Sequence, residues 1–401
     1  MTAASPSAPK TFRGLPHAFW VLIFGMFVNR VGAFVLPYLA LYLQTQRNIG
    51  ATESGLIVGA WGVGAVIAAL VGGQLADRWG RKRTMLLSLC GGAAVLAALS
   101  QARGFGQLAA LALALGAVAE LYRPAVSAAV ADLAAPELRS RAFSYLIWSY
   151  NLGFAVSPLI AGVIAEELGF GWLFVGDAAT MLAAAIVLAV WTAETRPAAA
   201  RSERNDSGFG EALRDRNLRP MLLAALMMGV AVVQIIATFG PLMSADGIDL
   251  KTYGRILALN GLLVALTQPW VVPLSERFGA SRVVPLCALV FCGGLALHAF
   301  VDSAIAHAFV VVVWTAGEVA LFPLCNTLVA NIAPTPLRGR YQGLYFVAWS
   351  TANVIGPPLG QELYARFGAG GWSVLPLSCA VVAGAALFVA TRRAASVKAA
   401  V

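Results

Sequence analysis

Long runs of apolar residues follow one another along nearly the whole chain, and short segments with charged residues, Gly or Pro separate them. About 20 mainly apolar residues in a helix cross the roughly 30 Å hydrocarbon layer of a bilayer. The pattern therefore predicts an all-α membrane protein with twelve transmembrane helices. Their approximate residues are 17–44, 52–76, 84–101, 105–132, 138–167, 170–193, 218–245, 251–275, 281–302, 304–333, 337–366 and 371–392.

The second half of the sequence repeats the first at a spacing of 199 residues. The matching positions are glycines, prolines and charged loop residues, and they include Gly55 with Gly254, Pro158 with Pro357, and the segment 77–80 (Asp-Arg-Trp-Gly) with 276–279 (Glu-Arg-Phe-Gly). Six predicted spans separate the copies. An even number makes the repeats parallel, related by an axis along the membrane normal.

This repeat predicts two six-helix bundles, at residues 1–193 and 218–401. The one long polar stretch, rich in Arg, Ala, Ser and Asp, lies between the bundles. Its composition predicts a linker at residues 194–217.

Composition and charge fit this picture, because only 12% of the 401 residues are charged and 59% are hydrophobic. Soluble domains carry roughly 25% charged residues. The net charge of +9 comes from Lys and Arg in short loops, most of them on one side of the predicted spans, together with the linker and both termini. The positive-inside rule then places both termini in the cytoplasm. Because these cations do not form one basic soluble face, we expect no nucleic-acid partner.

Nothing in the sequence indicates a cofactor or a metal. All five cysteines, Cys90, Cys287, Cys292, Cys325 and Cys379, fall within apolar runs and are predicted to be small buried hydrophobes. No metal-ligand spacing surrounds His298 or His307, and no phosphate-cradling Gly-x-x-x-x-Gly-Lys-Ser/Thr segment is present. We expect a protein that is not an enzyme and that is driven by an ion gradient.

The segment 73–83, Gly-Gln-Leu-Ala-Asp-Arg-Trp-Gly-Arg-Lys-Arg, resembles the loop motif between helices two and three of the major facilitator superfamily. The resemblance covers the whole chain. Glycine permits close helix contact, and an aspartate can cap a helix N-terminus or pair with arginine.

In that superfamily the motif is thought to latch the cytoplasmic ends of the bundles in the outward-facing state. The resemblance implies a latch made of Gly73, Asp77, Arg78, Arg81 and, at the end of span four, Asp132. The alternative is that the cations of this loop only orient the chain in the membrane.

A second resemblance lies in span five, at Gly153, Ser157, Pro158, Ala161 and Gly162. These residues resemble the motif typical of proton-coupled antiporters, although Ser157 and Ala161 replace two of its glycines. Small residues at this spacing let helices approach closely, and the proline perturbs the backbone. The resemblance implies export, in the manner of bacterial multidrug antiporters.

Five charged residues fall within predicted spans, although each charge in hydrocarbon costs at least about 2.5 kcal/mol. They are Arg30, Glu120, Arg123, Asp177 and Glu318. Four of them lie on spans one, four and ten, which line the central cavity of the resembled fold together with span seven. Polar residues on the same spans extend the expected substrate cavity, which consists of Asn29, Arg30, Arg123, Gln234 and Asn326.

Glu318 and Glu120 are the candidate proton-coupling residues. No cation lies near Glu318 in sequence, and an apolar setting favours the neutral form of a carboxyl group, so Glu318 can exchange a proton between the two sides. The alternative for Glu318 is a permanently paired or protonated structural acid.

Arg123 lies one helical turn from Glu120, which suits a local ion pair. Such a pair can be structural, exchange protons or bind a charged group of the substrate. Arg123 stands where the superfamily often has a functional arginine. Its proton-transfer role stays open, because Val126 and Ser127 replace the Gln-Gly that usually follows. Arg30 is a further candidate partner for either glutamate.

Asp177 lies in the outer part of span six, outside the usual cavity helices, and we expect it to serve helix packing or a polar contact near the surface. Because the embedded acids are few and form no cluster for sodium, we expect protons as the coupling ion.

The sequence predicts a monomeric proton-coupled antiporter in the bacterial cytoplasmic (inner) membrane. Its partners are membrane lipid, protons and an amphiphilic or drug-like small molecule that it exports by alternating access. The first alternative is a proton-linked symporter that takes up a polar or anionic nutrient, held by Arg30 or Arg123. The second is a lipid translocase or a membrane sensor.

Overall fold

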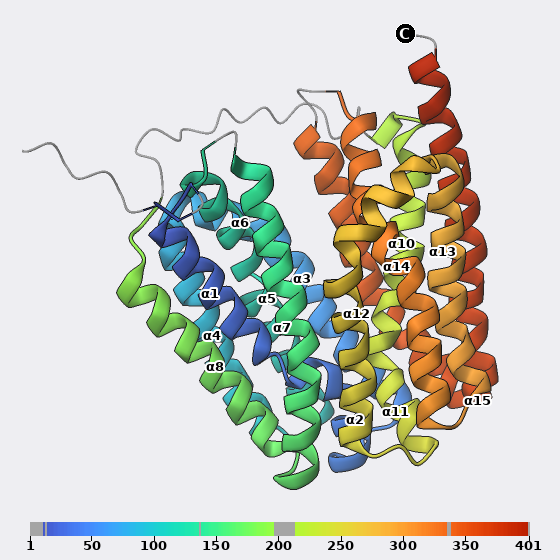
Figure 1. Cartoon of the computed structure of the whole chain (residues 1–401). Helices are drawn as coiled ribbons and strands as arrows, with labels where there is room; N and C mark the ends of the chain where they lie inside the picture. The colour runs from blue at the N-terminus through green and yellow to red at the C-terminus, as the bar shows by residue number, and fades with distance from the viewer. Residues whose placement is uncertain (1–10, 13, 136–137, 196–212, 335–337, 400–401) are drawn as a thin grey trace, which may run out of the picture.

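The computed structural model describes residues 11–12, 14–135, 138–195, 213–334 and 338–399, and nearly all of them are helical (Figure 1). A two-residue antiparallel pair, β1 (Thr11–Phe12) with β2 (Leu15–Pro16), precedes the first helix. The helices are α1 (His17–Val31), α2 (Val35–Gln46), α3 (Ala51–Trp79), α4 (Arg81–Gln101), α5 (Phe105–Ala119), α6 (Tyr122–Leu133), α7 (Arg139–Glu167), α8 (Gly171–Trp191), α10 (Leu218–Ala237), α11 (Phe239–Ala245), α12 (Leu250–Arg277), α13 (Ala280–Ala296), the 3₁₀ helix η2 (Leu297–Phe300), α14 (Ala304–Ile332) and α15 (Arg338–Ala399).

Ten helical segments of the described residues are long and apolar enough to cross a membrane. One of them, His17–Gln46, joins α1 and α2, and another, Phe105–Leu133, joins α5 and α6. A third, Arg340–Arg393, holds two helices, because the backbone at Gly368 has φ 65° and is not helical. The all-α membrane fold is confirmed, whereas the count of twelve spans stays a prediction.

The helices form two groups, α1 to α8 and α10 to α15, which lie side by side in Figure 1. Their ribbons meet at the end away from the C-terminus and diverge toward the end that carries it. We call these the far face and the terminal face. The contacts between the groups run mainly between α7 and α12 and between α3 and α15. Of the linker predicted at 194–217, residues 196–212 lie outside the described residues.

Glycines make the contact between the two groups close, and they do so symmetrically. A Cβ atom added to Gly55 of α3 would lie within 3.0 Å of the Pro357 carbonyl oxygen, and one added to Gly254 of α12 would meet the Pro158 carbonyl oxygen in the same way. These are the positions that the 199-residue repeat pairs. A Cβ atom on Gly73, nearer the terminal face, would have no neighbour within 4 Å. Among the described residues, these close glycine contacts between the groups therefore lie toward the far face.

Two of the apolar segments are interrupted where charged residues lie. Helices α1 and α2 are separated by residues 32–34, and α5 ends before Glu120 while α6 begins at Tyr122. Backbone groups freed inside a bilayer need partners from the protein. At the first break, the Ser157 hydroxyl donates to the Ala33 carbonyl oxygen at 3.0 Å. The Thr180 side chain fills the space where a Cβ atom of Gly32 would lie, so only glycine fits there.

Candidate functional site

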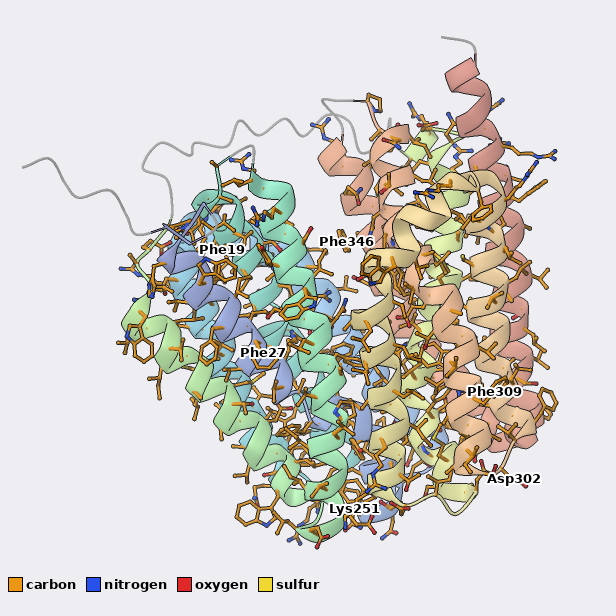
Figure 2. All side chains as sticks on the ribbon, in the orientation of Figure 1. Phe19, Phe27, Lys251, Asp302, Phe309 and Phe346 are labelled. Atoms are coloured by element: carbon orange, nitrogen blue, oxygen red, sulfur yellow. The ribbon has the colours of Figure 1, made fainter. Side chains whose placement is uncertain are left out.

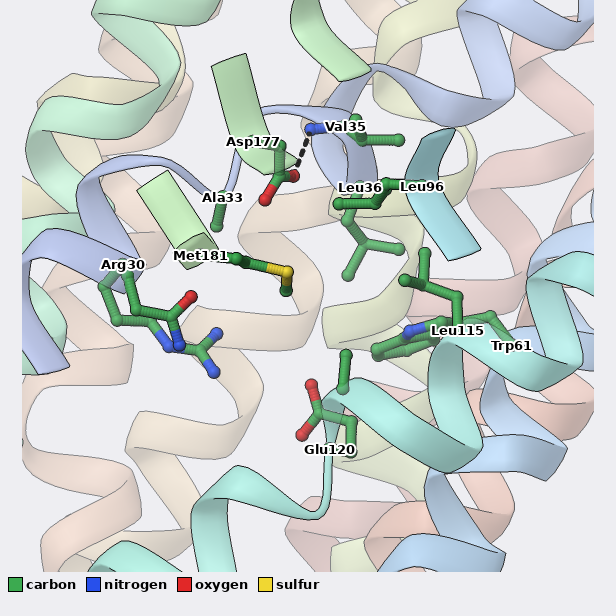
Figure 3. Close-up of a pocket in the computed structure, with 12 residues that line it drawn as sticks. Arg30, Ala33, Val35, Leu36, Trp61, Leu96, Leu115, Glu120, Asp177 and Met181 are labelled. Atoms are coloured by element: carbon green, nitrogen blue, oxygen red, sulfur yellow. Dashed lines mark hydrogen bonds between the residues drawn. The ribbon is translucent and has the colours of Figure 1, made fainter. Parts of the chain in front are cut away.

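An internal cavity of about 70 Å³ lies in the first helix group, between the two helix breaks (Figure 3). Its polar lining consists of Asn29, Arg30, Glu120 and Asp177. The remaining lining is mainly apolar and includes Trp61 and Met181 among others. A volume of this size holds a few water molecules, provided that polar partners are present. Three of the five embedded charges predicted from the sequence thus gather around one small space.

Asp177 of α8 fixes the break between α1 and α2. Its Oδ2 atom accepts a hydrogen bond of 3.2 Å from the backbone N–H of Val35, the first residue of α2 (Figure 3). A carboxylate at a helix N-terminus is favoured by the exposed N–H groups and the helix dipole. The side chain is buried, as the expected packing role requires. Its position on the cavity wall was not predicted, because Asp177 was expected to lie outside the cavity.

Arg30 enters the cavity from the last turn of α1 (Figure 3). Its guanidinium lies 4.7 Å from the ring centre of Tyr150, a cation–π distance. The buried Nε atom has no hydrogen-bond partner in the part of the chain that the structure describes. No ion pair joins Arg30 to Glu120 or Glu318 among the described residues. A buried donor without a partner costs about 1–3 kcal/mol, so this group favours an acceptor in the adjoining space.

Glu120 and Arg123 form the local pair that their spacing predicts, with 3.7 Å between Glu120 Oε2 and Arg123 Nη1. The Glu120 side chain is 17% exposed and that of Arg123 is 57% exposed, so the arginine reaches out of the packed helices. The Arg123 guanidinium also lies 5.5 Å from the ring centre of Tyr150. Tyr150 therefore contacts both embedded arginines.

Glu318 lies in the second helix group and belongs to a different polar cluster. Its Oε2 atom accepts a hydrogen bond of 2.6 Å from Asn260 Nδ2, and the same amide donates to Thr315 Oγ1 at 3.0 Å. Asn260 is buried on α12, one residue before Gly261, which packs against Ala155 of the other group. The sequence analysis overlooked Asn260, although an amide in the middle of an apolar run was the signal that marks it.

The other expected cavity residues have different surroundings. Asn29 lines the cavity, and Asn326 is exposed on α14. Gln234 corrects an expectation, because it is completely buried and its amide bonds only to the protein. The Nε2 atom donates to the carbonyl oxygens of Val230 and Gly356, and the Oε1 atom accepts from Thr238 and Trp372. With its hydrogen-bonding capacity filled, Gln234 holds α10 against α15.

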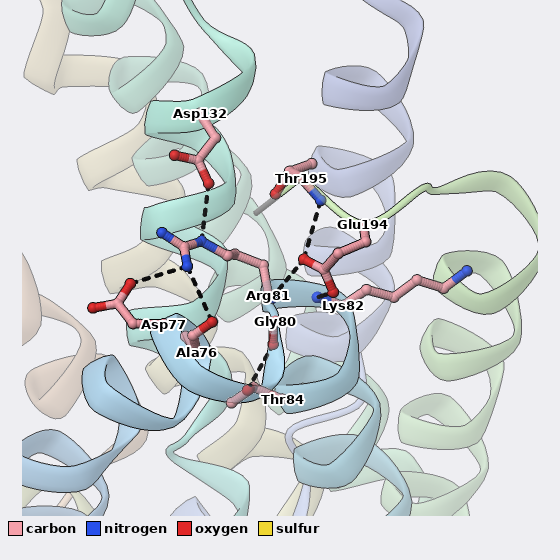
Figure 4. Close-up of polar contacts among 9 residues, drawn as sticks. All are labelled: Ala76, Asp77, Gly80, Arg81, Lys82, Thr84, Asp132, Glu194 and Thr195. Atoms are coloured by element: carbon pink, nitrogen blue, oxygen red, sulfur yellow. Dashed lines mark hydrogen bonds and ion pairs between the residues drawn. The ribbon is translucent and has the colours of Figure 1, made fainter. Parts of the chain in front are cut away.

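Three of the predicted latch residues, Asp77, Arg81 and Asp132, meet at the start of α4 (Figure 4). Arg81 Nε lies 2.9 Å from Asp132 Oδ2, and Arg81 Nη1 lies 2.9 Å from Asp77 Oδ1. The arginine also donates to the Ala76 carbonyl oxygen at 3.0 Å. Because Arg81 is buried, this cluster ties α3, α4 and α6 together.

The same cluster includes one acid that the sequence analysis left in the linker. Glu194 accepts hydrogen bonds from the backbone N–H groups of Arg81 at 2.7 Å and Lys82 at 3.2 Å, and so caps α4 (Figure 4). Gly80 begins the turn with φ 106°, a conformation that favours glycine. Arg78 is exposed on α3. The contacts of Arg81 with Asp77, Asp132 and Glu194 lie within the first helix group, and a latch between the groups stays a prediction.

The antiporter-like motif of α7 lies against both groups. Gly153 packs against the backbone at Arg30, and a Cβ atom on Gly162 would meet the Leu250 carbonyl oxygen of the second group. Pro158 and Ser157 flank the break after α1, where the Pro158 carbonyl oxygen accepts from the Tyr38 hydroxyl at 3.2 Å. Ala161 is completely buried. The expected close packing is present at each of these positions.

Comparisons with known proteins agree with this architecture. The family model described as Major Facilitator Superfamily matches residues 22–254 and 235–400. A Na(+), Li(+), K(+)/H(+) antiporter of Planococcus maritimus is 27% identical and covers 90% of this chain and 93% of its own length. The multidrug resistance protein MdtG of Serratia proteamaculans is 24% identical, with 90% of both chains covered. The crystal structure of a peptide transporter POT in complex with sulfate aligns with a TM-score of 0.77 at 17% identity, covering 97% of both chains.

Proposed function

Since the chain belongs to the major facilitator superfamily, whose members are generally transporters and not enzymes, we propose that it is a proton-coupled antiporter. It exports amphiphilic or drug-like small molecules by alternating access. The protein is a multi-pass membrane protein with bacterial relatives. We place it in the bacterial cytoplasmic membrane, with twelve spans and both termini in the cytoplasm.

The observation that carries the proposal is the cavity that brings Arg30, Glu120 and Asp177 together between two interrupted helices. Interrupted helices with charged groups at membrane depth are the usual setting of substrate and ion sites in transporters. A fold that needed these charges only for packing would leave them paired and sealed. Here the buried Arg30 Nε has no partner among the described residues, and the space beside it is large enough for water.

Glu318 serves as the coupling site of the second group. Among the described residues its hydrogen-bond partner is the neutral amide of Asn260, and no cation forms an ion pair that would hold it permanently ionised. Such a carboxyl can be neutral or charged without breaking an ion pair. Glu120 has Arg123 as a partner and supplies the second acid.

The way in which the two helix groups meet supports alternating access. Their close contacts lie toward the far face, at Gly55 and Gly254, whereas Gly73 near the terminal face has no neighbour from the other group. If the terminal face is cytoplasmic, the structure is the inward-facing state. Rocking the groups to close around Gly73 and Asp77 then gives the outward-facing state.

The names of two relatives support antiport, because one is a multidrug resistance protein and the other exchanges monovalent cations for protons. A second candidate is proton-linked uptake of an anionic solute. It is favoured by the two arginines that contact Tyr150, since Arg123 is mostly exposed and can meet an anion.

Purified protein in liposomes with an imposed pH gradient tests the proposal. Movement of a lipophilic cation such as ethidium should require the gradient and should be lost in Glu318→Gln and Glu120→Gln. Asp302→Asn is the matched control, because Asp302 is an exposed acid on a loop. Movement that continues after the gradient is collapsed would contradict proton coupling, and acid-stimulated uptake of an organic anion would favour the second candidate.

A further inference from the structure

A buried chain of hydrogen bonds lies in the second helix group, away from the residues discussed so far. Trp314 Nε1 lies 3.2 Å from His298 Nε2, His298 Nδ1 lies 2.8 Å from His307 Nδ1, and His307 Nε2 lies 3.1 Å from Asp246 Oδ2. Both imidazoles are essentially without exposure to solvent, and Phe239 packs edge-on against His298 with 4.4 Å between ring centres. Neither histidine has a role in the proposed transport site.

The indole at one end fixes the direction of every hydrogen bond in this chain. Indole N–H only donates, so His298 Nε2 must accept. A neutral His298 then carries its proton on Nδ1 and donates to His307 Nδ1. His307 in turn carries its proton on Nε2 and donates to the Asp246 carboxylate. With both imidazoles neutral, all three hydrogen bonds are satisfied.

A second proton on either imidazole cannot enter this chain without breaking it. A proton on His307 Nδ1 would face the N–H of His298, and a proton on His298 Nε2 would face the N–H of Trp314. Reversing the tautomers only moves this conflict to the indole. A proton that passes from Asp246 to an imidazole therefore forces the cluster to open at one of its internal contacts.

The cluster is connected to the contact between the two helix groups. Asp246 follows α11, is 25% exposed at its side chain, and lies four residues before Leu250, which begins α12. The N–H of Leu250 donates to Glu166 of the first group at 3.0 Å, and the Tyr253 hydroxyl donates to the Pro37 carbonyl oxygen at 3.0 Å. Asp246 thus anchors the corner from which the far-face contacts start.

Other titratable groups around the cluster are few among the described residues. Tyr364 of α15 lies within electrostatic range of Asp246, and Asp302 is exposed on the turn between η2 and α14. Glu362 and Arg366 of α15 pair with each other. Among the described charged groups, Asp246 is the one in contact with His307, and its partly exposed carboxylate connects the imidazoles to the far face.

We infer that Asp246, His307, His298 and Trp314 form a proton-binding site that opens to the far face, and that its protonation releases the far-face contact between the two helix groups. The inference rests on the proposed alternating-access function. It adds a site that senses acid on the side from which protons enter an exporter, distinct from Glu120 and Glu318.

The test measures the distance across the far face by double electron–electron resonance in nanodiscs. Labels are placed at Arg103→Cys and Asp302→Cys, which are exposed on loops of the two groups. Figure 2 shows Asp302 at the far face. Cys90 and Cys287 are replaced by Ser, and the other cysteines are buried. The background carries Glu120→Gln and Glu318→Gln, so both proposed coupling acids are neutral at every pH.

As the pH falls from about 8 to about 5, the range in which histidine changes charge, the population with a longer distance should increase. The open-to-closed ratio should rise by up to roughly tenfold for each pH unit over which the open cluster binds one more proton than the closed cluster. The double variant His298→Asn/His307→Asn should lose this pH response. Trp314→Phe should weaken it, because His298 Nε2 can then hold a proton in the closed cluster. His17→Asn, at an exposed histidine, should retain it.

A distance distribution that does not change with pH in the parent protein overturns the inference, as does a full response in the double histidine variant. If the double histidine variant folds poorly, Trp314→Phe still tests the inference, because it leaves both imidazoles in place. The measurement uses neither cargo nor a gradient. A failure of the transport proposal is therefore recognised separately, in the liposome assay.

Discussion

Replacing Gly254 by alanine perturbs the contact between the two helix groups at a single atom. The new Cβ would lie within 3.0 Å of the Pro158 carbonyl oxygen and of the Tyr38 hydroxyl. Neither neighbour can yield easily, because Pro158 contributes backbone and the Tyr38 hydroxyl bonds to the carbonyl oxygens of Pro158 and Leu250. The groups must separate locally to admit the methyl group.

Overpacking of this kind costs about 1–3 kcal/mol. Because the clash exists only when the far face is closed, the whole cost acts on the equilibrium between the closed and open arrangements. It should therefore raise the open-to-closed ratio about 5- to 150-fold. Gly55→Ala should act in the same direction, since the repeat places Gly55 against the Pro357 carbonyl oxygen.

Distance measurements between labels at Arg103 and Asp302 follow this shift. Gly106→Ala is the matched control, because a Cβ atom at this helical glycine would have no neighbour within 4 Å. We expect a longer far-face distance in Gly254→Ala and Gly55→Ala and no change in Gly106→Ala. An unchanged distance in both interface variants, with thermal stability also unchanged, would show that the glycine contacts do not hold the far face closed.

Three further predictions concern stability. Hydrogen bonds from the Thr252 N–H and hydroxyl lower the pKa of Asp249. The stabilising contribution of this carboxylate is therefore present above the ordinary aspartate pKa and is lost as the pH falls through the lowered value. Asp249→Ala should remove this acid sensitivity, measured by thermal unfolding against pH. Glu194→Ala should lower stability by about 1 kcal/mol through loss of the α4 cap, and an unchanged melting temperature would refute the cap. Gln234→Leu should cost at least about 2 kcal/mol by leaving buried partners unbonded, without altering cargo preference in folded protein; a changed preference would return Gln234 to the cavity.

Much of the fold was predictable because hydrophobic periodicity and the internal repeat act along the chain. Gly55 and Gly254 could be paired by alignment, and the structure shows them in equivalent contacts. Pairs close in sequence were also predictable, since Glu120 and Arg123 occupy one helix face. The Arg81–Asp132 pair followed from the family resemblance and is present.

The remaining features depend on partners from distant helices. Gln234 and Asn29 both carry an amide and both lie within apolar runs of the sequence. In the structure, however, Trp372 and Gly356 hydrogen-bond to the Gln234 amide, whereas Asn29 lines the cavity. His307 gives no signal on its own, because its partner Asp246 follows a different helix, α11. Asp177 lines the cavity because α1 ends beside it. The end of α1 before Gly32 could not be predicted from hydrophobicity, because the apolar run continues through it.

Proton release on cargo binding is the most direct test of the central claim that embedded acids exchange a proton for cargo. Purified protein in weakly buffered detergent solution is mixed with ethidium while a pH indicator follows the solution. The account predicts acidification that saturates with binding and disappears in Glu318→Gln, while Asp302→Asn behaves as the parent. Binding of ethidium with no proton released at any pH, or release undiminished in both Glu318→Gln and Glu120→Gln, would contradict it.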